Sequence, residues 1–211
     1  MLPLEQCRLY AFVDAAYLQG RDPVEIARQL CDGGADLIQL RAKKSTVEEI
    51  RQMALRILPV TRQANVGLVI NDHLDLALEI GADLCHLGQE DYLGLRTSEG
   101  GMRNGKVGVR IGLSTHAPDQ ARRAVEAGAD YVAVGPVYPT ATKPGAKPVT
   151  LDYVRWAAQH LAVPWFAIGG INLKNLADVL AAGARRICVV SAILNAPNVA
   201  GACAEFRKRL G

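Results

Sequence analysis

Gly34-Ala35-Asp36, Gly81-Ala82-Asp83 and Gly128-Ala129-Asp130 repeat one triplet along the chain, and a degenerate copy, Gly183-Ala184-Arg185, follows. Successive copies begin 47, 47 and 55 residues apart (34 to 81, 81 to 128, 128 to 183). Each copy follows a helical pattern and precedes a short apolar run. A glycine in this place allows a helix to end in a left-handed conformation, from which a short turn leads into a buried strand. The triplet therefore marks the passage from a helix to a strand.

The spacing of the triplets predicts eight strands. An interval of 47 residues is about twice one strand–helix unit, so a further strand is expected between successive copies. Apolar runs predict strands at 9–13, 37–40, 68–70, 84–87, 107–111, 131–134, 165–168 and 187–190. Amphipathic segments predict helices near 22–32, 46–63, 73–80, 117–127, 151–160, 173–182 and 198–209. The segment 91–104 is polar and rich in glycine, and it gives the weakest helix prediction.

Alternating strands and helices predict a parallel α/β sheet, and eight of each in this length predict a closed (β/α)8 TIM barrel. We expect one domain over residues 1–211. The alternative is an open doubly wound sheet, which typically places a G-x-G-x-x-G turn after its first strand. Residues 14–18 contain no such turn.

Composition excludes several classes of protein. Of the 211 residues, 50% are hydrophobic and 21% are charged, as in a globular protein, and no apolar run reaches the ~20 residues of a membrane span. A net charge of +3 does not predict a nucleic-acid surface. The five cysteines form no C-x-x-C pair, so we expect reduced thiols. Residues 1–20 do not resemble a signal peptide, and a cytoplasmic protein is expected, with a homo-oligomer left open.

Polar residues at the predicted strand ends indicate where the site lies, because catalytic groups of such barrels gather at that rim. Gln39, Arg41 and Lys43 follow the second strand on one face, and two cations there suit an anion. A solvated loop is the alternative for this segment. After the third and fourth strands, Asp72 and Asp91 predict a shared Mg²⁺ site, although Asp72 alone also suits a helix cap.

The remaining strand ends predict a second anion site. The long loop 135–145 carries hydroxyl groups and Lys143 between prolines, and it is a candidate lid. Gly169-Gly170 after the seventh strand and Ser191 after the eighth match the usual phosphate site of a barrel. His86 lies within an apolar strand, where a packed core histidine and a ligand or base are both open.

Taken together, these motifs resemble the thiamine phosphate synthase family from about Arg8 to Leu194. The resemblance rests on seven segments, at 39–43, 71–72, 86–91, 114–116, 135–143, 168–171 and 190–193. It implies a transferase that joins hydroxymethylpyrimidine diphosphate to hydroxyethylthiazole phosphate, with release of pyrophosphate by a dissociative displacement. It also implies one Mg²⁺ per subunit, small phosphorylated substrates, and neither nucleic acid nor a membrane as partner.

The resemblance also implies roles for individual residues. Asp72 and Asp91 would hold Mg²⁺, and Arg41, Lys43 and Lys143 would be catalytic through their charge. The implied substrate contacts are Gln39, Leu40, Arg41, Ala42, Lys43, Asn71, Ser114, Thr140, Ala141, Thr142, Lys143, Gly170, Val190 and Ser191. Ala42 stands where many relatives carry an acidic residue, and residues 144–146 form an insertion.

Two other functions stay open at this point. A related thiazole tautomerase would depend on acid–base chemistry, for which His116 is the candidate at the rim. A non-catalytic regulator that binds thiamine precursors would not need a metal pair. Asp72, Asp91 and the 140–143 loop favour the synthase over both.

Overall fold

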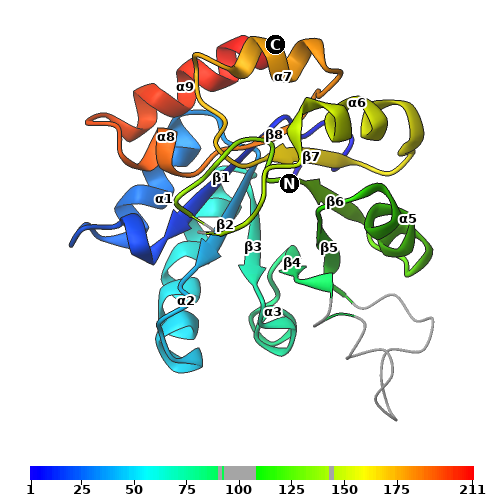
Figure 1. Ribbon diagram of the computed structural model, residues 1–211. Coiled ribbons are helices and arrows are strands. Elements are labelled where there is room, and N and C mark those ends of the chain that lie inside the picture. The colour runs from blue at the N-terminus through cyan, green and yellow to red at the C-terminus, as the bar shows by residue number, and fades with distance from the viewer. Residues whose placement is uncertain (90–91, 93–107, 143–144) are drawn as a thin grey trace.

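Eight parallel strands close into a barrel in chain order, and the last strand pairs with the first (Figure 1). The computed structural model describes residues 1–89, 92, 108–142 and 145–211. The closed barrel confirms the predicted (β/α)8 fold and excludes the open sheet. The strands are β1 (Leu9–Asp14), β2 (Leu37–Arg41), β3 (Gly67–Asn71), β4 (Leu84–Leu87), β5 (Arg110–Thr115), β6 (Tyr131–Val134), β7 (Trp165–Ile168) and β8 (Ile187–Cys188).

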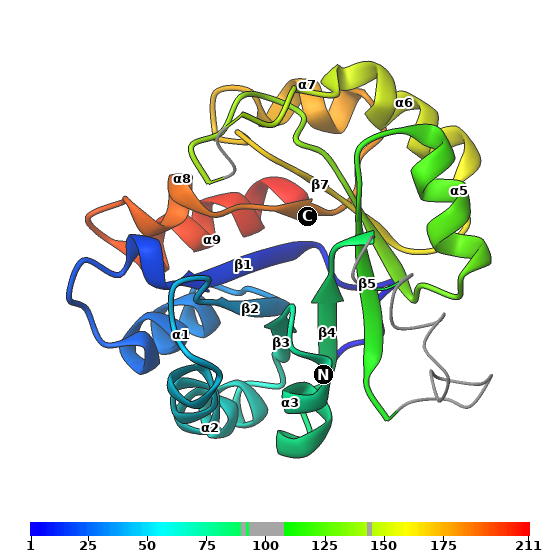
Figure 2. The ribbon, with the colours of Figure 1, turned by 60° about the horizontal axis from the view of Figure 1, so that its bottom comes forward.

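Helices surround the ring of strands, as Figures 1 and 2 show from two directions. They are α1 (Pro23–Asp32), α2 (Val47–Gln63), α3 (Leu74–Ile80), α5 (Pro118–Glu126), α6 (Thr150–His160), α7 (Leu176–Ala181), α8 (Ser191–Leu194) and α9 (Val199–Leu210), with a short 3-10 turn η1 (Ala15–Tyr17). The seven main helical predictions are confirmed to within three residues at each end. The weak prediction at 91–104 lies almost wholly outside the described residues.

Two strand predictions had the wrong bounds. β5 was expected at 107–111 but runs from Arg110 to Thr115, because the ladder with β4 begins at Arg110 and the ladder with β6 continues to Thr115. Ser114 therefore belongs to the strand itself. β8 was expected over 187–190 but ends at Cys188, since the chain turns there into α8.

The repeated triplet performs two tasks. Its glycines adopt positive φ at Gly34, Gly81, Gly128 and Gly183, as the sequence predicts for helix ends. Its aspartates also fasten neighbouring strands at their N-terminal ends: one carboxylate oxygen accepts a backbone N–H of the preceding strand. These bonds are Leu9 N to Asp36 Oδ2, 2.9 Å, Leu68 N to Asp83 Oδ2, 3.0 Å, and Ile111 N to Asp130 Oδ2, 2.7 Å. Arg185 of the fourth copy has no such acceptor.

Aromatic side chains fill the middle of the barrel. The ring centroid of Tyr10 lies 5.3 Å from that of Phe12 and 5.4 Å from that of Phe166, and Tyr131 meets Phe166 at 5.6 Å. All four rings are buried. This cluster fills the barrel interior, so a ligand can enter only at the end formed by the C-terminal ends of the strands.

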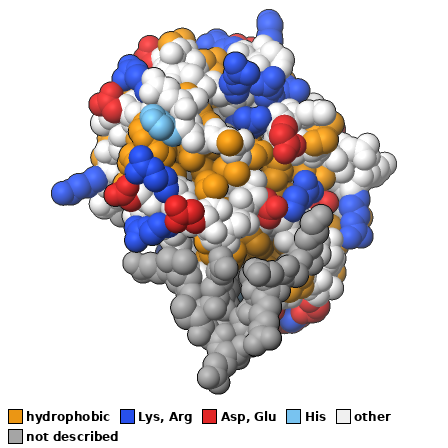
Figure 3. Space-filling model, turned by 90° about the vertical axis from the view of Figure 1, so that its right-hand side faces the viewer, with side chains coloured by type: hydrophobic (Ala, Val, Ile, Leu, Met, Phe, Trp, Pro, Cys, Tyr) orange, Lys and Arg blue, Asp and Glu red, His pale blue; other side chains and the backbone are white. Residues whose placement is uncertain are grey.

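The outer surface mixes charged and apolar side chains. Figure 3 shows the side that carries α5 and α6, where hydrophobic side chains lie between charged ones. There the Arg122 guanidinium lies 5.2 Å from the centre of the Trp156 ring, and His160 stacks on the same ring at 4.9 Å. Among the described helices, none has both the length and the apolar character that crossing a bilayer would require.

Candidate functional site

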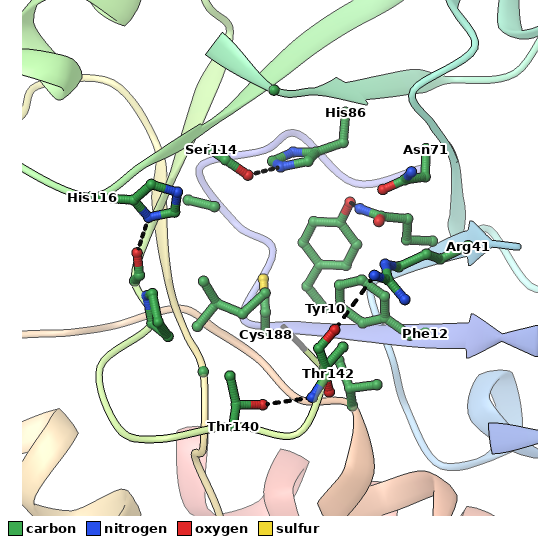
Figure 4. Close-up of a pocket in the computed structure, with 18 of the residues that line it drawn as sticks. Tyr10, Phe12, Arg41, Asn71, His86, Ser114, His116, Thr140, Thr142 and Cys188 are labelled. Atoms are coloured by element: carbon green, nitrogen blue, oxygen red, sulfur yellow. Dashed lines mark hydrogen bonds between the residues drawn. The ribbon is translucent and has the colours of Figure 1, made fainter. Parts of the chain in front are cut away.

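A cavity of about 680 Å³ opens at the C-terminal ends of the strands. Each of the eight strands contributes to its wall. Figure 4 labels ten of the lining residues. Eleven of the predicted site residues line it: Gln39, Arg41, Lys43, Asn71, Asp72, Ser114, Thr140, Thr142, Gly170, Val190 and Ser191.

Five predicted site residues are not found in this wall. Leu40 and Ala42 are buried and Ala141 is exposed, and none of the three lines the cavity. Leu40 alternates with Gln39 and Arg41 along β2, so its side chain packs in the core behind the barrel wall. Asp91 and Lys143 lie outside the described residues.

Arg41 is held by a buried carboxylate. Arg41 Nη1 donates to Asp14 Oδ2 at 2.7 Å, and the two residues are register partners at the ends of β2 and β1. The Asp14 side chain is 1% exposed and that of Arg41 is 17% exposed. Asp14 Oδ1 also accepts the backbone N–H of Ala16 at 3.0 Å. The carboxylate therefore fixes the guanidinium at the cavity wall, where its remaining N–H groups can meet an anion.

Lys43 and Asp72 form a second ion pair, at the mouth of the cavity. Lys43 Nζ lies 2.9 Å from Asp72 Oδ2, and both side chains are more exposed than the Asp14–Arg41 pair. Asp72 has a positive φ of 65°, which is uncommon for a residue other than glycine. Its backbone N–H donates to the His86 carbonyl oxygen at 2.9 Å, which ties the end of β3 to β4. Asp72 does not cap α3, because the residue before that helix is His73 and no side-chain cap is present.

The loop that follows β6 reaches across the cavity to η1 and β2. The Tyr17 hydroxyl lies 3.0 Å from Thr142 Oγ1, and Arg41 Nη2 lies 3.5 Å from the Thr142 carbonyl oxygen. The Thr142 N–H donates to Thr140 Oγ1 at 3.2 Å, so the two threonines form one turn (Figure 4). The predicted lid segment is thus in contact with the arginine on the opposite wall.

The glycine turn after β7 packs tightly against this same loop. Gly170 has a φ of +65°, and a Cβ there would lie 2.6 Å from the Pro139 carbonyl oxygen. Asn175 Nδ2 donates to the Gly170 carbonyl oxygen at 3.0 Å. Among the described residues, the backbone N–H groups of Gly170 and Ser191 have no hydrogen-bond acceptor. Both residues line the cavity, so these N–H groups are available to a phosphate.

A series of hydrogen-bonded polar side chains crosses the barrel interior from β2 to β5. It joins Gln39, Tyr10, Tyr131, His86 and Ser114 in that order, through the contacts Gln39 Nε2–Tyr10 Oη, Tyr10 Oη–Tyr131 Oη, Tyr131 Oη–His86 Nδ1 and His86 Nε2–Ser114 Oγ. Burial raises the pKa of both tyrosine hydroxyls well above the ordinary value. His86 is thus a hydrogen-bonded interior histidine, as one of the two interpretations from the sequence expected. It also lines the cavity, so the other interpretation, a ligand or base, stays open.

His116 lies on the side of the cavity opposite Arg41 and Asn71 (Figure 4). Its Nδ1 is hydrogen-bonded to the Gly135 carbonyl oxygen, which can only accept, so Nδ1 carries the proton. Its backbone N–H donates to Gln120 Oε1 at 2.7 Å. This geometry orients the ring in the wall of the cavity.

Sequence reasoning missed several residues of the site. Asp14 ends an apolar strand in register with Arg41, and an acid in that place was the available indication. Tyr10 and Phe12 alternate within the first strand and so share an inward face with Asp14. Nothing local marks Tyr17, because its partner Thr142 is distant in sequence. The partners of Asn175 are local, at Gly170 and Asn172, and an asparagine soon after the glycine pair was the available indication.

Comparisons with known proteins agree on one family. The family model described as thiamine monophosphate synthase matches residues 9–193. A thiamine-phosphate synthase of Thermus thermophilus is 49% identical over 179 residues, covering 84% of this chain and 84% of the relative. One of Lawsonia intracellularis is 41% identical over 203 residues, covering 96% and 92%. The solved structure of a thiamine phosphate pyrophosphorylase from Pyrococcus furiosus superimposes with a TM-score of 0.84 at 30% identity, covering 98% and 96%.

Proposed function

Because the chain belongs to the thiamine monophosphate synthase family, we propose that it joins hydroxymethylpyrimidine diphosphate to hydroxyethylthiazole phosphate. The products would be thiamine phosphate and pyrophosphate, which makes the enzyme a transferase. The observation that carries this proposal is that one cavity is lined on two sides by different groups, both of a kind that can bind an anion. Arg41 and Lys43 line one side, and the Gly170 and Ser191 backbone lines another.

The wall formed by β2 and β3 suits the diphosphate. Arg41, fixed by Asp14, and the Lys43 ammonium, paired with Asp72, would contact its oxygens, with the Asn71 amide beside them. When the bond between the pyrimidine methylene carbon and the diphosphate oxygen breaks, the electron pair goes to that oxygen. The two cations stabilise the growing negative charge, and Lys143 would add a third from the loop after β6.

The residues described at the mouth fit a magnesium ion in part. Asp72 supplies one carboxylate, and Mg²⁺ is commonly bound by one or two carboxylates together with water and substrate phosphate oxygens. Within the described residues no group of three or more metal-ligating side chains occurs, and Asp91 lies outside them. We propose one Mg²⁺ per subunit, held by Asp72 and Asp91. When bound, it would neutralise charge on the diphosphate.

The wall formed by β7 and β8 suits the thiazole phosphate. Its charge does not change during the reaction, so neutral backbone N–H donors at Gly170 and Ser191 are sufficient to hold it. The thiazole nitrogen attacks with its own lone pair and loses no proton. The reaction therefore needs no general base, and the chain contributes by orientation and charge.

We further propose that residues 1–211 form one domain and that the enzyme works in the cytoplasm. The five cysteines are free, as expected from their spacing, which suits a reducing compartment. Small phosphorylated molecules, and neither nucleic acid nor a membrane, are the proposed partners.

One assay separates this proposal from its alternatives. The full chain is incubated with both precursors, and pyrophosphate release is followed with and without Mg²⁺. A synthase releases pyrophosphate only when the thiazole phosphate and Mg²⁺ are both present. A tautomerase would aromatise the thiazole without release, and a regulator would bind without turnover. Absence of release, or release that needs neither thiazole nor metal, contradicts the proposal.

Two variants test the proposed residue roles. Asp72→Ala and Lys143→Ala are expected to reduce turnover by about a hundredfold or more. Asp72→Ala removes a carboxylate proposed to hold Mg²⁺, and Lys143→Ala removes a positive charge proposed to stabilise the leaving group. The controls are Asp75→Ala and Lys147→Ala, which remove exposed charges of the same sign close by in sequence. The circular dichroism of all four variants should match that of the parent. A normal rate in either test variant would remove that residue from the site.

A further inference from the structure

Four hydrogen bonds form a continuous chain through the barrel interior, from β2 to β5. The chain runs from Gln39 Nε2 to Tyr10 Oη, 2.6 Å, to Tyr131 Oη, 3.1 Å, to His86 Nδ1, 3.0 Å, and from His86 Nε2 to Ser114 Oγ, 2.9 Å. Both terminal residues line the cavity. Whether one end presents a hydrogen-bond donor or an acceptor to a ligand therefore depends on which of the two the other end presents.

The series of hydrogen bonds depends on the absence of a side chain at Gly112. His86, Gly112 and Tyr131 are register partners in a row across β4, β5 and β6. A Cβ on Gly112 would lie 1.9 Å from Tyr131 Cζ and 2.4 Å from its hydroxyl oxygen. Only a glycine in β5 allows the Tyr131 phenol to lie over that strand and reach His86.

Proton counting gives the chain a direction. Both phenols stay protonated, because burial raises their pKa, and each has one proton to donate. Since Gln39 Nε2 donates to Tyr10, the Tyr10 proton goes to Tyr131, and the Tyr131 proton goes to His86 Nδ1. His86 then carries its proton on Nε2 and donates it to Ser114 Oγ. The Ser114 proton and the Gln39 carbonyl oxygen are left for the cavity, and neither has a partner among the described residues.

The opposite direction is also chemically complete. If the Gln39 amide is turned, its carbonyl oxygen accepts from Tyr10, and every bond in the chain reverses. His86 would then carry its proton on Nδ1. Gln39 would present an NH₂ donor to the cavity, and Ser114 would present an acceptor. The His86 tautomer therefore reports the direction of the whole chain.

We propose that Tyr131 and His86, acting through Tyr10, are positioning residues that make the cavity selective for an aminopyrimidine. The Gln39 carbonyl oxygen would accept from an exocyclic amine, and the Ser114 hydroxyl would donate to an unprotonated ring nitrogen. This inference rests on the proposed function and specifies how its pyrimidine is recognised. The corresponding oxopyrimidine carries a carbonyl group and a ring N–H, so it presents the opposite groups to both ends.

The selectivity follows from the cost of unpaired polar groups. Gln39 is almost fully buried, and a buried acceptor facing another acceptor loses its hydrogen bond without a replacement by water. Sites built to hydrogen-bond a polar group reject the analogue that lacks it far more strongly than apolar sites reject a methylene. We expect the parent enzyme to prefer the aminopyrimidine diphosphate over the oxopyrimidine diphosphate by at least about a hundredfold.

The first test is independent of turnover. Proton–nitrogen correlation spectra of the ¹⁵N-histidine-labelled full chain distinguish the tautomers of its four histidines, and the His86→Gln variant assigns the His86 signals. The expected result is a His86 ring protonated at Nε2 and unprotonated at Nδ1. A ring protonated at Nδ1, or at both nitrogens, at neutral pH overturns the inference even if the enzyme is a synthase.

The second test compares two tyrosine variants by calorimetric titration with each diphosphate. Tyr131→Phe removes the central hydroxyl and is expected to reduce the amino-over-oxo preference about tenfold, with the affinity for thiazole phosphate unchanged. The control is Tyr153→Phe, which removes another buried hydroxyl. That hydroxyl is hydrogen-bonded to Thr115 and Ala117 and is not part of the series from Gln39 to Ser114, so the variant should keep the parent preference. An unchanged preference in Tyr131→Phe overturns the inference.

The two levels of the proposal fail in different ways. If neither pyrimidine diphosphate binds the parent protein, the proposed function fails, and the recognition scheme fails with it. If the aminopyrimidine binds and reacts but the oxopyrimidine binds equally well, only the recognition scheme fails. If Tyr131→Phe does not fold, the His86 tautomer and the parent preference still decide the inference.

Discussion

Replacing Asp14 by asparagine tests how strongly the protein depends on its one carboxylate behind Arg41. Asp14 accepts two bonds, from Arg41 Nη1 at 2.7 Å and from the Ala16 N–H at 3.0 Å. Asparagine keeps an oxygen for the Ala16 N–H, because it is as good as aspartate at such a turn. It loses the charge that faces Arg41 and can place an NH₂ group against the guanidinium. The variant therefore isolates the ion pair.

The expected loss follows from burial. A hydrogen bond to a charged partner contributes roughly 1.5–3 kcal/mol, whereas most exposed ion pairs contribute less than about 1 kcal/mol. Asp14 is almost completely buried and Arg41 is mostly so, and solvent can screen little of this pair. We expect Asp14→Asn to lower the free energy of unfolding by about 2–3 kcal/mol. We also expect the KM for the pyrimidine diphosphate to rise, because Arg41 is no longer fixed.

A second aspartate provides a matched control. Asp22 precedes α1, accepts the Val24 N–H at its Oδ1 and pairs with Arg56, so its contacts repeat those of Asp14. The Asp22 and Arg56 side chains are 49% and 57% exposed, and this pair is screened. Asp22→Asn should therefore cost less than about 1 kcal/mol and leave the KM unchanged.

Urea unfolding at neutral pH measures the difference. With an m-value of roughly 2 kcal/mol per M, the midpoint of Asp14→Asn should fall by about 1 M or slightly more. The m-value should stay constant, because the folded structure is the same in both variants. If Asp14→Asn and Asp22→Asn differ by less than about 0.5 kcal/mol, burial does not strengthen the ion pair and the reasoning is refuted.

Two further predictions concern the opposite wall and the cysteines. Gly170→Ala would place a Cβ only 2.6 Å from the Pro139 carbonyl oxygen at a residue with positive φ. The KM for thiazole phosphate should therefore rise at least about tenfold in steady-state assays. An equal rise in the KM for the diphosphate would count against two separate walls. Burial raises the pKa of the Cys31 thiol to about 11, and it raises the pKa values of the four more deeply buried thiols further. At pH 8 a thiol reagent should therefore label the native protein slowly. After unfolding, the same reagent should label all five cysteines rapidly. Labelling should accelerate as the pH rises toward these values, and a rapid phase in the native protein at pH 8 would contradict the burial.

The fold was predictable because its determinants are local. The triplet glycines have positive φ where the spacing predicts helix ends, and the apolar runs form the strands. The second task of the triplet was not predictable, because Asp36 acts on Leu9 and Asp130 on Ile111, each in a neighbouring strand. The pairing of strands must be known before these carboxylates can be assigned partners. The same reason applies to β5, whose bounds depend on its neighbours.

The site was predictable where one residue type at a strand end carries the chemistry, and not where a contact crosses the barrel. Eleven predicted residues line the cavity because strand ends share one rim. Asp14 was missed because its meaning depends on Arg41 in the next strand. Tyr17 and Thr142 meet across 125 positions of sequence, which no local pattern can indicate.

The two walls of the cavity differ in the way that the proposed reaction requires. On the β2 and β3 side each cation has an acid behind or beside it, Asp14 for Arg41 and Asp72 for Lys43. Charged groups that are already oriented stabilise a charge that grows as a bond breaks, because no reorganisation is needed at that moment. On the β7 and β8 side the donors are neutral N–H groups, which would hold a phosphate whose charge stays constant in the proposed reaction. An exchange of these walls would give the retained phosphate the stronger field and the leaving group the weaker one, and so favour binding over bond cleavage.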